Sequence, residues 1–161
     1  MKYHFKLLLS AGILAASMGI QTVQAAKTSI TIALQLEPPH LDPTSAAAGA
    51  IDSVLYSNVF EGLTRFASDG AVIPGLAKSW EISGDGKEYI FHLNSSVTFH
   101  DGSTMDASDV KFSLDRARAE DSTNAQKALF SGIENVEVLS SDKVKVTLAS
   151  PNGSFLFNMA W

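Results

Sequence analysis

The chain has 161 residues, with 12 Lys and Arg against 17 Asp and Glu, so its formal net charge is −5. Hydrophobic residues make up 45% and charged residues 18%, a globular composition that excludes a disordered or collagen-like chain. The acidic balance argues against nucleic acid as a partner, because phosphate binding needs a basic surface. The absence of cysteine excludes disulfide scaffolds, thiol catalysis, thiolate zinc sites and iron–sulfur clusters.

The first 25 residues have the layout of a secretory signal peptide. A basic start with Lys2 and Lys6 precedes 14 uncharged residues over 7–20, and small residues follow up to Ala25. A retained membrane anchor is the alternative, but it needs roughly 20 apolar residues to span a bilayer. We therefore predict cleavage after Ala25 and a mature chain outside the cytoplasm. No cysteine stands near the cut, which excludes a lipid anchor there.

The first part of the mature chain is predicted to hold a strand and a helix. Residues 28–36 alternate in polarity and are rich in Ile and Thr, which predicts a strand. Prolines prevent regular structure over 37–43. Apolar residues then recur at four-residue spacing from Ile51 to Val59, which predicts an amphipathic helix within 46–63.

Two β-hairpins are predicted further along the chain. The first spans 79–93 around the Gly-Asp-Gly sequence at 84–86, and the second spans 135–149 around Ser-Ser-Asp at 140–142. Asp-Gly pairs begin at residues 69, 85 and 101. We interpret them as three turns and not as a repeat, because the residues between them differ.

A longer helix is predicted over 106–119, between the hairpins. It opens with two Asp residues three positions apart, which is a pattern similar to a capping box. Its buried stripe is predicted to be Val110, Leu114 and Ala117. We interpret the charges from Lys111 to Glu120 as a solvated helix face. A second, short helix is predicted near 125–130.

The last seven residues, 155–161, are strongly apolar. Six of the seven are apolar, and Phe155, Phe157 and Trp161 are among them. Burying one such side chain is worth about 1.5–3 kcal/mol, so we expect the segment to pack on something. The segment packs either on the core of its own domain or on polypeptide that follows Trp161 in a longer protein. We expect the second case, in which the chain is truncated at Trp161.

Motifs for catalysis or cofactor binding are absent from the sequence. There is no Gly-x-Gly-x-x-Gly fingerprint, phosphate-binding loop or Gly-x-Ser-x-Gly elbow, and no two histidines are spaced like a helical metal pair. His100 beside Asp101, and Glu37 with Asp42, are the arrangements that acid–base chemistry could use. Turn chemistry explains both pairs more simply. We therefore predict no catalytic residue, no metal site and no cofactor.

Six blocks of sequence, in order along the chain, resemble the family 5 extracellular solute-binding proteins, the receptors of ABC importers for peptides, nickel and opines. They are Leu-Glu-Pro-Pro-His-Leu-Asp-Pro (36–43), Val-Phe-Glu-Gly-Leu-Thr-Arg (59–65), Pro-Gly-Leu-Ala-Lys-Ser-Trp (74–80), Asp-Gly-Lys (85–87) with Tyr-Ile-Phe-His-Leu (89–93), Val-Thr-Phe-His-Asp-Gly (97–102) and Ala-Ser-Asp-Val-Lys-Phe-Ser-Leu (107–114). The family often has Arg where this chain has Asn94, a position that we interpret as structural.

The resemblance implies an α/β (mixed α+β) fold, the truncated amino-terminal part of a two-lobed periplasmic-binding-protein fold of the large peptide-binding type. Residues 26–65 would supply the first segment of the ligand-cleft lobe, and 66–161 an incomplete, smaller α/β domain. The implied function is that of a monomeric periplasmic receptor, with peptides as the expected solute. It would close about a hinge on its solute and deliver it to an inner-membrane permease.

The resemblance also implies where a ligand would lie. In relatives the segment after Leu-Asp-Pro borders the cleft, and here Ala47, Ala48 and Gly49 would let a ligand backbone approach closely. A plain helix start is the alternative for these residues. Asn124, in the loop 122–124, is a second ligand-binding candidate.

Two other functions stay open at the level of sequence. One is a small secreted interaction module with Phe155, Phe157 and Trp161 buried. The other is a secreted hydrolase using Glu37, Asp42 or His100, which would have to converge in one pocket. If the receptor interpretation holds, most groups that fix the ligand lie beyond these residues, and this stretch alone should bind solute weakly or not at all.

Overall fold

The computed structural model describes residues 28–46, 48–56 and 58–161, and it assigns residues up to Leu34 and residues 35–161 to separate units. The described part of the first unit, 28–34, contains no helix or strand and exposes its isoleucines. The strand predicted over 28–36 is therefore wrong for these residues. A strand needs a hydrogen-bonding neighbour, and no described residue pairs with this segment. The predicted signal peptide lies outside the described residues.

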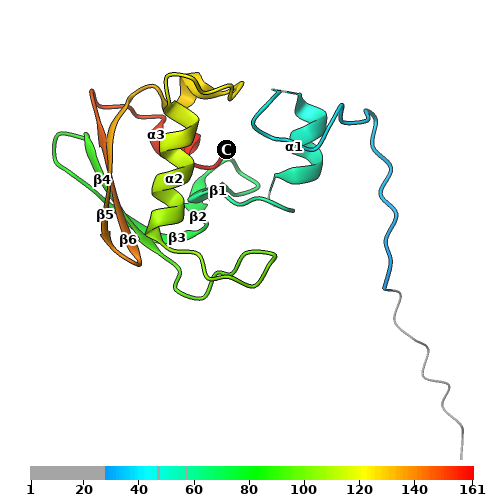
Figure 1. The fold of residues 1–161 in the computed structure, drawn as a ribbon, viewed down its shortest axis with the longest axis horizontal. Helices are drawn as coiled ribbons and strands as arrows, with labels where there is room; N and C mark the ends of the chain where they lie inside the picture. The colour runs from blue at the N-terminus through cyan, green and yellow to red at the C-terminus, as the bar shows by residue number, and fades with distance from the viewer. Residues whose placement is uncertain (1–27, 47, 57) are drawn as a thin grey trace, which may run out of the picture. The chain divides into compact units, whose positions relative to one another are not determined.

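A four-stranded antiparallel sheet in the order β3-β4-β6-β5 is central to the second unit (Figure 1). Its strands are β3 (Ala77–Ile82), β4 (Glu88–Leu93), β5 (Ile133–Ser140) and β6 (Lys143–Leu148). The sheet is two hairpins side by side, so both predicted hairpins are confirmed. Alternate residues of β4 and β6 are buried, and these form one apolar face: Tyr89, Phe91, Leu93, Val144, Val146 and Leu148.

Helix α2 (Ala107–Arg118) covers that apolar face. The Asp106 carboxylate accepts the Ser108 N–H at 2.7 Å, and the Asp106 N–H donates to Asp109 Oδ2 at 2.8 Å, so the predicted capping box is present. The predicted stripe of Val110, Leu114 and Ala117 is buried. The short helix predicted near 125–130 is the 3-10 helix η1 (Lys127–Phe130).

Helix α1 (Gly49–Leu55) is shorter than the helix predicted within 46–63. Tyr56 already has extended backbone angles, and the N–H groups of Val59 and Phe60 both donate to the Leu55 carbonyl in a turn. Val59, predicted to continue the buried stripe, is exposed. Tyr56 and Val59, an aromatic and a β-branched residue after Leu55, have low helix propensity, which favours the end of the helix there.

Strands β1 (Thr64–Phe66) and β2 (Val72–Pro74) form a separate small hairpin. Its turn and the two later Asp-Gly turns share one geometry. Gly70, Gly86 and Gly102 all have positive φ, between 70° and 87°. In each case the preceding Asp carboxylate accepts the N–H of the residue two positions on, at 2.9 to 3.1 Å. The interpretation of the three pairs as turns is confirmed.

Two glycine motifs that are separate in the sequence meet in space. The Leu76 N–H donates to the Gly62 carbonyl and the Ala77 N–H to the Leu63 carbonyl, both at 3.0 Å. A methyl group on Gly75 would lie 2.7 Å from the Gly62 carbonyl oxygen. The family blocks at 59–65 and 74–80 are thus joined through their backbones, and we call this contact the backbone junction.

Asn94 also binds the backbone junction. Its side-chain amide donates to the Gly75 carbonyl at 3.0 Å, and its N–H donates to the Leu76 carbonyl at 2.9 Å. These contacts support the interpretation of position 94 as structural.

The apolar C-terminal segment packs on the core of its own unit. Helix α3 (Phe155–Asn158) is tied to β1, because the Thr64 hydroxyl donates to the Leu156 carbonyl at 2.7 Å. Phe155 is 1% exposed, whereas Phe157 and Trp161 are 45% and 47% exposed. The interaction-module hypothesis predicted that all three aromatic residues are buried. That prediction is wrong for Phe157 and Trp161.

Candidate functional site

A cavity of about 710 Å³ opens between the segment 43–61 and the buried side of α2. Its lining is mostly apolar and includes Leu55 of α1, Leu114 of α2 and Met159 after α3. A pocket with apolar walls and a few polar groups is the usual form of a small-ligand site.

The polar lining of this cavity has one sign of charge. Asp52, Glu61 and Asp109 line it, and none of its described lining residues is Lys or Arg. Asp109 is engaged in the capping box of α2, so Asp52 and Glu61 are the two carboxylates left to face a ligand. The resulting negative potential favours a ligand that carries a cationic group.

Two of the segments that the sequence analysis selected lie together at this cavity. The Ala125 N–H donates to the Thr44 carbonyl at 3.0 Å, which joins the loop 122–124 to the start of the segment 44–50. Asn124 lines both this cavity and a neighbouring hollow of about 420 Å³, and so does Thr44. The Asn124 side-chain oxygen accepts the Gln126 N–H at 2.8 Å, which fixes the orientation of its amide.

The other predicted ligand residues lie outside the lining of both hollows or outside the described residues. Ala47 is not among the described residues. Ala48 is the residue before α1 and is half-buried, and Gly49 is the exposed first residue of that helix. A methyl group on Gly49 would meet no atom within 4 Å. The role of these residues in ligand binding stays a prediction.

The proline loop 37–43 is held by hydrogen bonds among its own polar groups and those just after it. The Asp42 carboxylate accepts both the hydroxyl and the N–H of Thr44, at 2.7 and 2.8 Å. These two bonds lower the pKa of Asp42 below its ordinary value. The His40 ring accepts the Asp42 N–H through Nδ1, so its Nε2–H donates to the Ser45 hydroxyl. The loop therefore presents Thr44 to the cavity in a fixed geometry.

The residues considered for hydrolysis do not converge in one pocket. His100 lines the larger cavity, but Glu37 and Asp42 line neither hollow. His100 donates from Nε2 to the Val59 carbonyl, and Asp101 accepts the N–H and hydroxyl of Ser103 within its turn. The explanation of these residues by turn chemistry fits these contacts.

Sequence reasoning placed Thr44 in the predicted ligand segment but did not single it out, and it missed Asp52 and Glu61 as lining residues. It selected small side chains because they permit close approach, whereas the cavity lining includes hydroxyl residues such as Thr44 and carboxylates such as Asp52 and Glu61. The spacing Asp-Pro-Thr was the available signal for Thr44, since Asp fixes the backbone two residues on. Asp52 and Glu61 gave no signal, because their approach to the cavity depends on how 43–61 turns back on α2.

Two general properties of the described residues bear on the site. No group of three or more His, Asp or Glu side chains in this part of the chain could hold a metal ion. None of the described helices is long and apolar enough to cross a bilayer.

Known proteins are similar to this chain in sequence. The sequence model of the family described as bacterial extracellular solute-binding proteins, family 5 Middle, matches residues 71–160. A glutathione-binding protein, GsiB, from Pectobacterium atrosepticum is 37% identical over 95% of this chain and 29% of its own length. Di/tripeptide-binding protein 1 from Pseudomonas aeruginosa is 30% identical over 92% of this chain and 31% of its own length.

The fold is matched by solved structures as well. The crystal structure of NikZ from Campylobacter jejuni in complex with Ni(L-His) aligns with a TM-score of 0.70 and 35% identity. That alignment covers 78% of this chain and 25% of NikZ. The chain thus spans about three-tenths of the length of the curated relatives that it matches.

Proposed function

The chain belongs to the bacterial extracellular solute-binding proteins of family 5, and from that premise we propose that it contributes to the peptide-binding component of an ABC importer. In this proposal the protein acts in the periplasm as a monomer, binds a short peptide and delivers it to an inner-membrane permease. It carries out no catalysis. The first 25 residues direct export and are removed.

The carboxylates at the cavity suit a peptide. A peptide has a cationic amino terminus, apolar side chains and a backbone rich in hydrogen-bonding groups. The cavity offers Asp52 and Glu61 within mostly apolar walls, and no Lys or Arg among its described lining residues. Nickel and glutathione are the competing solutes, because relatives are named for binding them.

Uptake in the bacterium that encodes the chain tests this function. Disrupting the gene is expected to reduce uptake of radiolabelled trialanine, and a plasmid copy should restore it. If trialanine uptake is unchanged while uptake of glutathione or nickel–histidine falls, the importer role stands and the peptide assignment fails. If uptake of all three solutes is unchanged, the importer role fails.

A substitution at Gly49 tests the predicted ligand approach. We expect Gly49→Leu to reduce trialanine uptake on the order of tenfold, which corresponds to about 1.4 kcal/mol of lost binding. An added Cβ at Gly49 would meet no atom within 4 Å, so we attribute the expected loss to contact with a bound ligand. Uptake at matched protein abundance, measured by immunoblot, gives the effect.

Gly153→Leu is the matched control. An added Cβ at Gly153 would also meet no atom within 4 Å, and Gly153 is distant in sequence from the predicted ligand segment. If both variants transport trialanine like the parent, the segment 47–49 does not face the ligand.

A further inference from the structure

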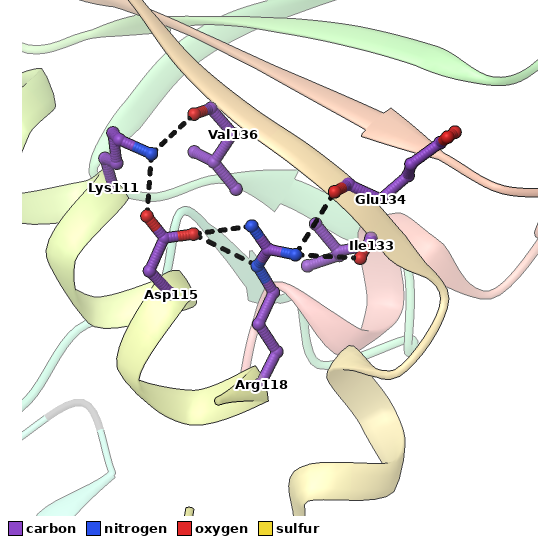
Figure 2. Close-up of polar contacts among 6 residues, drawn as sticks. All are labelled: Lys111, Asp115, Arg118, Ile133, Glu134 and Val136. Atoms are coloured by element: carbon purple, nitrogen blue, oxygen red, sulfur yellow. Dashed lines mark hydrogen bonds and ion pairs between the residues drawn. The ribbon is translucent and has the colours of Figure 1, made fainter. Parts of the chain in front are cut away.

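Charged side chains of α2 bind the backbone of β5 (Figure 2). Lys111 Nζ donates to the Val136 carbonyl at 2.8 Å, and Arg118 donates to the carbonyls of Ile133 and Glu134 at 3.2 Å. Three carbonyl groups of β5 thus receive hydrogen bonds from side chains of α2.

Asp115 links the two cations. Its Oδ2 accepts from Lys111 Nζ at 2.7 Å, and its Oδ1 accepts from two nitrogens of Arg118 at 2.8 and 3.0 Å. Burial raises the pKa of Asp115, but the hydrogen bonds from Lys111 and Arg118 outweigh it, and the net pKa lies below its ordinary value. The carboxylate therefore stays ionised at neutral pH and holds both cations in place.

The three residues occupy one face of the helix. Positions 111, 115 and 118 follow the i, i+4, i+7 pattern, one residue after the buried stripe 110, 114 and 117. The interpretation of the whole charge run as a solvated face is therefore wrong for this face. Arg118 is only 26% exposed, whereas Arg116 and Glu120 are exposed.

Strand β5 is an end strand of the four-stranded sheet, so its outer backbone groups have no strand partner among the described residues. Such an edge is a template for pairing with another chain. Register irregularities at Ile133/Asn135 and Val138/Ser140 leave a regular run between them, where Val136 lies. Val138 and Leu139 are exposed apolar residues in the same strand, which makes the edge more prone to association.

We propose that the Lys111–Asp115–Arg118 network keeps β5 from pairing with a further extended strand, in particular with β5 of a second copy of this chain. The network binds the carbonyls of Ile133, Glu134 and Val136, which are then not free to accept from an incoming strand. Lys111 binds the Val136 carbonyl in the regularly paired part of β5. Arg118 binds the carbonyls of Ile133 and Glu134, where the pairing with β6 is irregular. Charged side chains that cover an edge are a known defence against edge-to-edge association.

Removing both cations tests the proposal. The full chain with Lys111→Ala and Arg118→Ala is expected to shift in sedimentation velocity from a monomer to dimers and larger species as its concentration rises. Hydrogen exchange read by mass spectrometry should then show increased protection of amides in 133–140. The control is Arg116→Ala, which removes an exposed cation from the same helix and should leave the chain monomeric.

Three results would overturn the proposal. One is a folded double variant that sediments as the parent does. Another is an assembly whose new protection lies outside β5, for example over 155–161. The third is a parent chain that already associates through 133–140. If circular dichroism shows the double variant to be unfolded, Lys111→Ala and Arg118→Ala are measured singly, with the same readouts deciding.

Discussion

Replacing Gly62 with alanine is expected to lower the free energy of unfolding by about 3 kcal/mol, the upper end of the usual range for overpacking. The new methyl group would lie 2.5 Å from the Met159 carbonyl oxygen and 3.0 Å from two backbone atoms of Ala160. Gly75→Ala is expected to behave similarly, with its nearest contact at 2.7 Å from the Gly62 carbonyl oxygen. All of these closest neighbours are backbone atoms, which cannot rotate away as a flexible side chain can.

The opposing effect on the unfolded chain is smaller. Gly→Ala stabilises a protein by about 0.4–1 kcal/mol through the unfolded state when the native site accepts the methyl group. Here the steric cost exceeds that gain, so the net sign is destabilising. Urea denaturation followed by circular dichroism measures the change.

Gly84→Ala is the control for this pair of variants, because Gly84 has no positive φ and no atom within 4 Å of an added methyl group. It should change the unfolding free energy by no more than about 0.5 kcal/mol. Values this small for Gly62→Ala and Gly75→Ala as well would mean that the backbones of the two motifs are not in close contact.

The parts of the fold that were predicted correctly from the sequence depend on residues that are close together in the sequence. The Asp-Gly turns need only a carboxylate, a glycine with positive φ and the next N–H. The capping box of α2 needs two Asp residues three apart. Each hairpin pairs two strands that are adjacent in the sequence, so alternation and a turn were enough.

The incorrect predictions depend on contacts between distant residues. The segment 28–36 has the alternation of a strand, but a strand also requires a partner, and alternation does not supply one. The helix within 46–63 is an exception, because it ends at a local turn in which the N–H groups of Val59 and Phe60 donate to the Leu55 carbonyl. Lys111 and Arg118 resemble ordinary surface charges in the sequence, because the β5 carbonyls that they bind lie 25 and 15 residues later.

The candidate site divides in the same way. Asn124 was predicted from the family resemblance. It lines the cavity because the next residue, Ala125, donates its N–H to the carbonyl of Thr44, which lies about 80 residues earlier in the sequence. The carboxylates of Asp52 and Glu61 could not be distinguished by pattern from other acidic residues. Local sequence can therefore propose a ligand segment, but the charge of a cavity depends on which segments pack together.

Phe155→Ala is expected to lower the free energy of unfolding by about 3–5 kcal/mol, the usual cost of truncating a buried Phe. Phe155 lies in α3 at 1% exposure, and its ring centroid is 4.6 Å from that of Tyr89 and 6.3 Å from that of Phe91. Both partners belong to β4 at the centre of the sheet. The loss would leave a cavity between α3 and the sheet that the surrounding strands cannot collapse to fill.

Phe157→Ala is the matched comparison, because it truncates the same side chain on the same helix at a half-exposed position. Its ring contacts Phe66 at a centroid distance of 4.5 Å, so we expect a loss of about 1 kcal/mol. Denaturant unfolding of both variants measures the difference. If Phe155→Ala loses much more unfolding free energy than Phe157→Ala, α3 belongs to the core that β4 and α2 share. Equal losses would mean that the segment packs through its exposed aromatic residues instead, and α3 would then have to be placed differently on β1.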